Sequence, residues 1–185
     1  MNNKKYFEYL KKRSFLGYLY RKSWLYPKLN RELKGVTLDV GCGIGDMLSS
    51  RKHTIGVDIN SLNIKFCRDR GCEAYLMSKN KLPFASHKFD SILLDNVLEH
   101  IQNPFPILKE LKRVLKPGGV IVIGVPGIKG YEVDLDHKVF YDESALKKLA
   151  KKNGFKVTKY LYTPICKSFF LSRYIKQYCI YSIWR

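Results

Sequence analysis

Short apolar runs alternate along most of the chain with segments in which apolar residues recur every three or four positions. The runs have the length of buried strands, and the longer segments have the spacing of amphipathic helices. This pattern predicts strands at residues 36–40, 53–59, 73–77, 90–96, 120–126, 156–162 and 178–184. It predicts helices at residues 46–50, 61–71, 104–115 and 143–154.

The order of these elements indicates the fold class. From residue 36 onward strands alternate with helices, which predicts an α/β, doubly wound fold with a mostly parallel sheet covered by helices on both faces. Residues 4–33 differ, because aromatic and aliphatic residues stand between Lys and Arg at helical spacing, with a break expected near Pro27. No repeat or linker is evident, so we expect a single globular domain with an N-terminal helical segment, 1–34, and a main part, 35–185.

Composition narrows the class of protein. A chain of 185 residues with 45% hydrophobic content is typical of one soluble domain with a sizeable core. The five cysteines are odd in number and form no paired CxxC motif, so we expect reduced thiols rather than a disulfide framework or a zinc site. The first residues lack the apolar core of a signal peptide, and no apolar run reaches the roughly 20 residues of a membrane span. We therefore expect a cytoplasmic protein.

The stretch LDVGCGIGD, residues 38–46, carries the first candidate chemistry. Its glycines alternate, but residue 46 is an aspartate where a dinucleotide-binding GxGxxG loop needs its third glycine, and no GK[ST] of a P-loop follows. The carboxylates of Asp39 and Asp46 would repel a pyrophosphate, whereas they suit a ligand that carries an ammonium and a sulfonium. Asp58 ends the next predicted strand, where an acid can accept both ribose hydroxyls. The pattern indicates an adenosine ligand without phosphates.

Four stretches together resemble a known family. They are LDVGCGIGD at 38–46, GVDIN at 56–60, LPFASHKFDSILLDNVLEHI at 82–101 and LKPGGVIVIGVP at 115–126. In order and spacing the chain is similar to the class I S-adenosylmethionine-dependent methyltransferases, in the broad group that includes the ubiquinone/menaquinone-biosynthesis type. The resemblance implies a Rossmann-like fold whose seven-stranded, mostly parallel sheet has an antiparallel last strand.

The resemblance also implies S-adenosylmethionine as the cofactor and assigns residues to its parts. Asp39 and the loop would face the methionine, Asp58 the ribose, and Asn96 the mouth near the methyl group. Ser78 stands where family members commonly carry an acid near the adenine amino group, so backbone groups and packing by Ile59 would take that contact here. The expected cofactor-binding residues are Asp39, Gly41, Cys42, Gly43, Gly45, Asp58, Ile59, Ser78 and Asn96.

Methyl transfer from a sulfonium is an in-line displacement that needs no metal, so no metal site is expected and positioning supplies much of the catalysis. An oxygen acceptor also needs a base, and His is the usual choice near neutral pH. His137 is the preferred base or orienting residue, because the resemblance places a His and an aromatic residue in the loop after the fifth strand. His100, at the end of the fourth strand, and Tyr141 are further candidates.

The sequence also narrows the acceptor. After the fourth strand it reads DNVLEH, where methyltransferases acting on amino groups of bases usually carry an NPPY-like turn, so an oxygen acceptor is favoured. We expect a small-molecule, lipid-linked or glycan-linked acceptor. Two alternatives stay open, an RNA methyltransferase and a module that binds S-adenosylmethionine without catalysis.

Net charge bears on the partner. The formal charge of +18 lies in the two ends, since residues 1–34 hold 10 Lys and Arg against 2 acids, and residues 147–185 hold 10 against none. In the family the N-terminal segment commonly covers the mouth of the site, so we expect residues 1–34 to form a basic aromatic lid. Such a lid could steer an anionic substrate, contact a membrane surface or bind RNA, in that order of preference. Its apolar residues could equally serve only to pack the lid onto the domain.

Overall fold

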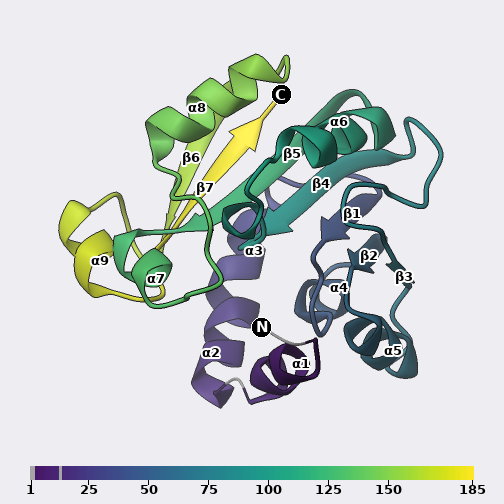
Figure 1. Ribbon diagram of the computed structural model, residues 1–185, viewed down its shortest axis with the longest axis horizontal. Coiled ribbons are helices and arrows are strands. Elements are labelled where there is room, and N and C mark those ends of the chain that lie inside the picture. The colour runs from purple at the N-terminus through teal and green to yellow at the C-terminus, as the bar shows by residue number, and fades with distance from the viewer. Residues whose placement is uncertain (1–2, 13) are drawn as a thin grey trace.

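The computed structural model describes residues 3–12 and 14–185 and has one seven-stranded sheet in the order β3-β2-β1-β4-β5-β7-β6 (Figure 1). The strands are β1 (Thr37–Val40), β2 (Thr54–Asp58), β3 (Ala74–Leu76), β4 (Phe89–Asp95), β5 (Leu115–Pro126), β6 (Val157–Thr163) and β7 (Cys179–Trp184). The first five strands pair parallel with one another, and β7 pairs antiparallel with both β5 and β6. The predicted fold class, with its antiparallel last strand, is confirmed.

The four helices that the pattern predicts in the main part of the chain are present as α4, α5, α6 and α8. The described helices are α1 (Asn3–Lys11), α2 (Phe15–Tyr20), η1 (Arg21–Leu25), α3 (Tyr26–Asn30), α4 (Asp46–Ser50), α5 (Ser61–Asp69), η2 (Leu98–His100), α6 (Phe105–Val114), α7 (Ile128–Glu132), α8 (Glu143–Lys152) and α9 (Phe169–Tyr174). Here η1 is a π-helical turn and η2 a 3-10 turn. The sequence pattern did not predict α7 or α9.

Helices cover both faces of the sheet, as the continuous apolar runs of its central strands require. Successive strand residues point to opposite faces. Ile92 and Leu94 of β4 therefore pack in the cluster that includes α6 and α8, whereas Leu93 packs in the cluster that includes Leu25 and Leu29 of η1 and α3. All three strand residues are fully buried.

The N-terminal segment departs from one expectation. The chain does not break at Pro27, because helix α2 continues through η1 into α3 (Figure 1). The Tyr26 N–H bonds to the Arg21 carbonyl, a π-type bond, and Pro27 then lies in the first turn of α3, where its missing N–H costs nothing. The break comes earlier, where Ser14 caps α2 by accepting a bond from the Gly17 N–H. Residues 1, 2 and 13 of the predicted segment lie outside the described residues.

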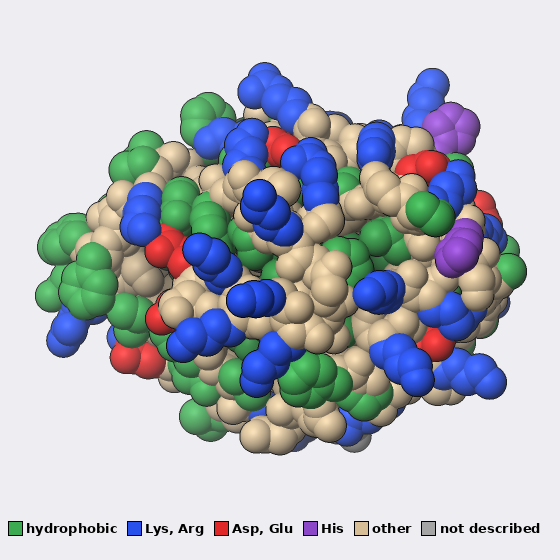
Figure 2. Space-filling model, turned by 90° about the horizontal axis from the view of Figure 1, so that it is seen from above, with side chains coloured by type: hydrophobic (Ala, Val, Ile, Leu, Met, Phe, Trp, Pro, Cys, Tyr) green, Lys and Arg blue, Asp and Glu red, His purple; other side chains and the backbone are tan. Residues whose placement is uncertain are grey.

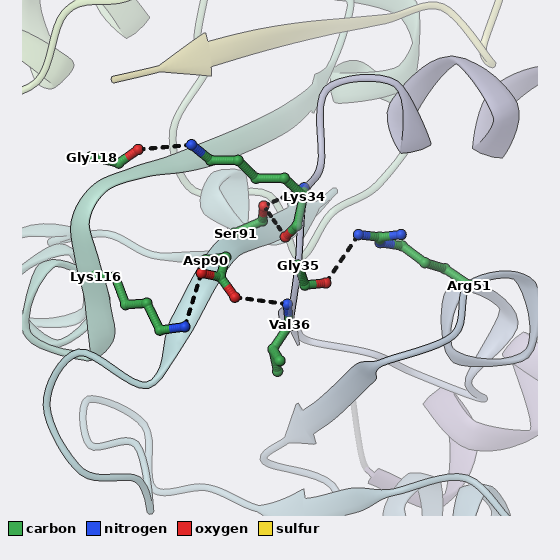
Figure 3. Close-up of polar contacts among 8 residues, drawn as sticks. All are labelled: Lys34, Gly35, Val36, Arg51, Asp90, Ser91, Lys116 and Gly118. Carbon is green, nitrogen blue, oxygen red and sulfur yellow. Dashed lines mark hydrogen bonds and ion pairs between the residues drawn. The ribbon is translucent and has the colours of Figure 1, made fainter.

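The amino edge of the sheet is fastened by polar contacts (Figure 3). Asp90 accepts hydrogen bonds from the Val36 N–H at 2.9 Å and from Lys116 Nζ at 2.9 Å, which ties the starts of β1, β4 and β5 together. The Lys34 N–H donates to Ser91 Oγ at 2.7 Å beside them. These contacts join the amino ends of the strands. The carboxyl ends lie on the opposite side of the sheet, where open α/β sheets bind ligands, and the candidate functional residues lie there.

Among the helices of residues 3–12 and 14–185, none combines the length and apolar character needed to cross a membrane.

Candidate functional site

The glycine loop connects β1 to α4 at the carboxyl edge of the sheet. Gly41 and Gly45 have φ values of +75° and +80°, in the left-handed region that favours glycine. A Cβ on Gly41 would lie 2.5 Å from Val97 Cγ2, and one on Gly45 would lie 2.9 Å from Cys67 Sγ. Side chains therefore cannot occupy these positions without a shift of their neighbours, and the loop presents bare backbone where the methionine part of the expected cofactor would lie.

Asp58, at the end of β2, ties this loop to α5. Its Oδ2 accepts hydrogen bonds from the Gly43 N–H at 2.9 Å and from Asn63 Nδ2 at 3.1 Å, and its Oδ1 accepts one from the Asn60 N–H at 2.8 Å. The carboxylate is 5% exposed, and burial raises its pKa although these bonds oppose the shift. Since a carboxylate offers about four acceptor positions, about one remains.

The residues around Asp58 fit an adenosine. Asn63 Oδ1 is a buried acceptor without a hydrogen-bond partner in the described part of the chain, and Nδ2 of the same side chain bonds to Asp58. Two acceptors suit the two hydroxyl donors of a ribose. The Met77 N–H bonds to the Asp58 carbonyl at 3.0 Å, which brings the exposed Ser78 beside the ribose position, and Ile59 is 60% exposed there. An apolar side chain with this exposure can cover one face of a base.

Acidic side chains gather where the methionine part would lie. Asp39 is buried on β1, and burial together with Asp95 raises its pKa. Asp95 Oδ1 accepts hydrogen bonds at 2.8 Å from Tyr181 Oη and from Asn96 Nδ2, and Asn96 has a φ of +56° directly after β4. These carboxyl groups, which accept hydrogen bonds, fit a cationic ammonium and sulfonium, because nearby negative charge stabilises both.

Arg21 is a residue that sequence reasoning missed. It enters from η1 and lies 3.8 Å from the Asp46 carboxylate. Burial alone would lower the pKa of its guanidinium, but Tyr26, Asp95 and other nearby groups outweigh burial and raise it, so the charge is held in place. No spacing in the sequence links Arg21 to the glycine loop, because a helix packed across the sheet brings it there.

Cys42 is placed differently from the other loop residues. Its side chain lies in a small core with Leu48, Ile64 and Cys67, and its N–H bonds to the Val57 carbonyl at 3.0 Å. The pKa of its thiol is raised by the hydrogen bond with Cys67 and by burial. The Cys42 side chain therefore packs in the core beneath the glycine loop, between α4 and α5, and does not line the candidate site.

Helix α1 lies over the loop and the end of β2. A Cβ on Gly43 would lie 3.2 Å from Cδ1 of Leu10, which is 1% exposed, and Asn60 Nδ2 bonds to the Asn3 carbonyl at 2.9 Å. Phe7 packs edge-on against Phe66 of α5, with ring centroids 5.7 Å apart. The first helix thus packs against Gly43, Asn60 and Phe66, a placement that helical spacing alone could not give.

A second cluster lies beyond the end of β4 and unites two predicted residues, His100 and His137, with Glu99. The Glu99 carbonyl accepts the N–H groups of Lys138 and Val139 at 2.7 and 3.1 Å, which fastens the loop after α7 to η2. His137 Nε2 then lies 3.8 Å from Glu99 Oε1, and the two imidazole centroids are 4.7 Å apart.

Burial controls protonation in this cluster. Glu99 is 1% exposed, neither carboxylate oxygen has a hydrogen-bond partner among the described residues, and burial raises its pKa to about 8. Burial and His137 lower the pKa of His100, so its imidazole is neutral near pH 7. Tyr141 lies in the main core at 6% exposure, and burial and Glu99 raise its pKa. The His137 side chain is 8% exposed, so the side chains of His137 and Tyr141 are both largely buried.

Known proteins are similar to this chain in sequence. Residues 38–123 match the protein family described as a methyltransferase domain. An uncharacterized protein of Methanocaldococcus jannaschii is 39% identical over 92 residues, which are 50% of this chain and 45% of that protein. A human protein named probable tRNA methyltransferase 9B is 35% identical over 117 residues, which are 58% of this chain and 25% of that protein. The chain therefore spans less than half the length of these curated relatives.

A solved structure is similar over nearly the whole chain. The crystal structure of an S-adenosylmethionine-dependent methyltransferase of Thermotoga maritima, described as a possible histamine N-methyltransferase, matches with a TM-score of 0.74 and 20% identity over 96% of both chains. At this identity the likeness shows the fold alone.

Proposed function

We propose that the chain, whose residues 38–123 match a methyltransferase domain, binds S-adenosylmethionine and transfers the cofactor's methyl group to an oxygen atom of its acceptor. The cofactor supplies an electrophilic methyl group on a sulfonium. The chain's own residues have to hold the acceptor oxygen in line with that methyl group and keep water away, which can lower the barrier by roughly 7 to 11 kcal/mol.

The observation that carries this proposal is the cluster of Glu99, His100 and His137 at the same sheet edge as the glycine loop. An oxygen acceptor must lose a proton, and the cluster offers a group that can take part in its removal. His137 Nδ1 lies 2.9 Å from the Tyr131 carbonyl, which can only accept, so Nδ1 carries the hydrogen and Nε2 keeps its lone pair. A neutral imidazole in this state is the usual general base near pH 7.

Exposed apolar side chains near this cluster favour a lipid-linked acceptor. Leu135, in the loop that carries His137, is 93% exposed, and Phe169 and Phe170 of α9 are 70% and 66% exposed. Helix α9 adjoins α7 through a bond of 3.0 Å from the Ile128 N–H to Ser172 Oγ, and hydrophobic side chains project at the left edge of Figure 2, where α9 lies in Figure 1. Because the chain as a whole has a formal charge of +18, we infer that this apolar edge suits an acceptor with an apolar tail and an anionic group at a membrane surface.

We propose a lid role for the N-terminal segment as well. Because Leu10 covers Gly43 and α1 bonds to Asn60, the cofactor would enter or leave only when α1 moves. Leu10→Ala should therefore raise the rate constants for cofactor association and dissociation together, measured by stopped-flow fluorescence. Exposed Tyr9→Ala, on the same helix, is the control. Identical rates for wild type and Leu10→Ala would contradict a lid.

RNA is the second candidate acceptor, because the human relative is named a tRNA methyltransferase. Lys and Arg side chains also spread over the face seen in Figure 2, with few acids among them. Helix α8 contributes the exposed residues Lys147, Lys148, Lys151 and Lys152 to the basic surface. An RNA acceptor would give binding that weakens steeply as salt rises.

The deciding experiment is transfer of labelled methyl from S-adenosylmethionine into a lysate separated into RNA, protein, lipid, glycan and small-molecule fractions. Asp58→Ala is the control for cofactor dependence. Label in the lipid, glycan or small-molecule fraction supports the oxygen acceptor. Label confined to nuclease-sensitive material would overturn that ranking in favour of RNA.

A further inference from the structure

We propose that Glu99, His100 and His137 form a binding site for a divalent first-row transition metal ion. The site deepens the proposed function, on which its catalytic consequence rests, but metal binding itself can be measured without any methyl transfer. One ligand atom from each of the three residues lies within 4.8 Å of the others. Zinc–ligand bonds are about 2.0–2.2 Å, so the donors would draw together slightly around an ion.

The unpartnered carboxylate of Glu99 points to a ligand. The side chain is 1% exposed, and both oxygens lack a hydrogen-bond partner among residues 3–12 and 14–185. Buried polar groups are normally hydrogen-bonded, and a buried carboxylate without a partner is costly. His137 Nε2 stands 3.8 Å from Glu99 Oε1, beyond hydrogen-bond distance, with Asp134 Oδ2 3.8 Å from the same nitrogen. A cation among these atoms would pair the Glu99 charge.

Both imidazoles are held in the form that binds a metal. His137 Nδ1 lies 2.9 Å from the Tyr131 carbonyl, and His100 Nδ1 lies 3.3 Å from the Asp136 carbonyl. Carbonyl oxygens only accept, so each Nδ1 carries the hydrogen and each Nε2 keeps its lone pair. Metal-binding histidines almost always donate the other ring N–H to such a partner, which fixes the tautomer and the ring orientation.

The surrounding structure keeps these donors together. The Glu99 carbonyl accepts two N–H groups from the residues that follow His137, and the Tyr131 ring stacks on His137 at 5.4 Å with an interplanar angle of 17°. The loop therefore cannot carry His137 away without breaking both bonds to η2. A preorganised set of donors reduces the entropy lost on binding.

The donor chemistry indicates which ions fit. Two imidazole nitrogens and one carboxylate suit Zn²⁺, Fe²⁺, Co²⁺ or Ni²⁺, whereas Mg²⁺ and Ca²⁺ prefer oxygen ligands alone. Three protein ligands leave at least one position open for an oxygen atom of the acceptor. A bound ion would lower the pKa of the acceptor hydroxyl.

Methyl transfer with a metal-held acceptor balances without a redox step. With its Nε2 on the ion, His137 serves as a ligand in place of a base. The acceptor O–H bond then breaks and its proton passes to solvent, the oxygen forms a bond to the methyl carbon, and the C–S bond breaks with its electron pair staying on sulfur. The metal site therefore favours an acceptor whose reacting hydroxyl can bind the ion. Such an acceptor has a second oxygen next to that hydroxyl, from a phosphate, a carboxylate or a vicinal hydroxyl.

The test is titration of chelator-treated protein with Co²⁺, followed by visible absorption, and with Zn²⁺, followed by calorimetry. We expect one ion per chain and Co²⁺ d–d bands without thiolate charge transfer. Glu99→Gln and His137→Gln should weaken binding at least tenfold, while the exposed His87→Asn should bind as the wild type does. His87 has a φ of +57°, which Asn tolerates, so this control removes a histidine without backbone strain.

Several outcomes would overturn the site. These are absence of bands, bands that persist unchanged in both variants, and thiolate charge transfer that places the ion on cysteine. Melting temperatures measured without metal check that the variants fold. The wild type and His87→Asn should gain thermal stability with Zn²⁺, and the two ligand variants should gain less. If the ion binds but no fraction of the lysate accepts methyl groups, the proposed function fails and the metal site stands. If transfer occurs in the presence of chelator and Co²⁺ gives no bands, the site fails and the proposed function stands.

Discussion

Replacing Asp58 by asparagine tests the cofactor site at the residue that organises it. The change keeps the size of the side chain but turns one acceptor oxygen into a donor. Asp58 Oδ2 accepts from Gly43 and Asn63, and Oδ1 accepts from Asn60. The best orientation of the new amide keeps its oxygen toward Gly43 and Asn63, which leaves the Asn60 N–H facing a donor.

The magnitude follows from those bonds. An unsatisfied buried donor costs about 1–3 kcal/mol, and about 2 kcal/mol lowers the melting temperature of a chain of this size by about 4–8 °C. A hydrogen bond to a charged group is worth about 1.5–3 kcal/mol. If one ribose hydroxyl bonds to the carboxylate, the dissociation constant should therefore rise roughly 10- to 150-fold.

The assay is calorimetric titration with two ligands, S-adenosylhomocysteine and 5′-methylthioadenosine. The second keeps the ribose but lacks the amino acid, so a ribose contact predicts the same loss of affinity for both. Asp69→Asn is the matched control, because that carboxylate is exposed on α5 and pairs only with Lys65 in the described contacts. Weakening of S-adenosylhomocysteine alone would mean that the substitution at Asp58 distorts the glycine loop. Unchanged affinity for both ligands with a lowered melting temperature would refute the ribose contact.

Three further changes test other parts of the structure. His137→Ala should lower turnover about 10²- to 10⁴-fold while cofactor affinity stays within about twofold, and equal turnover in steady-state kinetics would remove it from the mechanism. Arg113 donates two hydrogen bonds to the Glu110 carboxylate and lowers its pKa to about 2. The ionised Glu110 carboxylate should therefore stabilise the fold by about 1–2 kcal/mol above pH 4.5, and this contribution should be lost as the pH falls toward 2. Glu110→Gln should remove this pH dependence in urea unfolding, and parallel curves for the two proteins would disprove it. Gly41→Ala should lower the free energy of unfolding more than the control Gly71→Ala in the same urea assay. Both glycines have a φ of +75°, but only Gly41 has a close neighbour that a Cβ would meet. Equal losses of unfolding free energy would exclude that clash.

The strands and the cofactor loop were predictable because their causes are local. A parallel strand is apolar where it is buried on both faces, so the centre of β4 and residues 120–126 of β5 are visible as runs in the sequence. The alternating glycines mark backbone with positive φ, which few other residues adopt. The predicted break at Pro27 was wrong because the prediction used the proline alone. A π-helical turn directly before Pro27 lets the helix continue.

What the sequence could not supply depends on tertiary contacts. Arg21 and Leu10 reach the loop because two N-terminal helices pack across the carboxyl edge of the sheet, and helical spacing does not say which surface an amphipathic face will cover. The environment of Glu99 could not be predicted from the sequence either. Its sequence neighbours do not indicate that both carboxylate oxygens are buried without hydrogen-bond partners in the described part of the chain.

The two halves of the site therefore differ in how they are encoded. On the proposed cofactor side the backbone conformation of the glycine loop sets the geometry, and glycine is favoured where the backbone turns into the left-handed region. On the acceptor side Glu99 and His137 meet only because the loop after α7 bonds to the Glu99 carbonyl. Loops of this kind can change their side chains while the sheet beneath them is unchanged. We therefore expect the chemistry of the Glu99, His100 and His137 cluster to indicate the acceptor, because in the proposed function the glycine loop holds only the methyl donor.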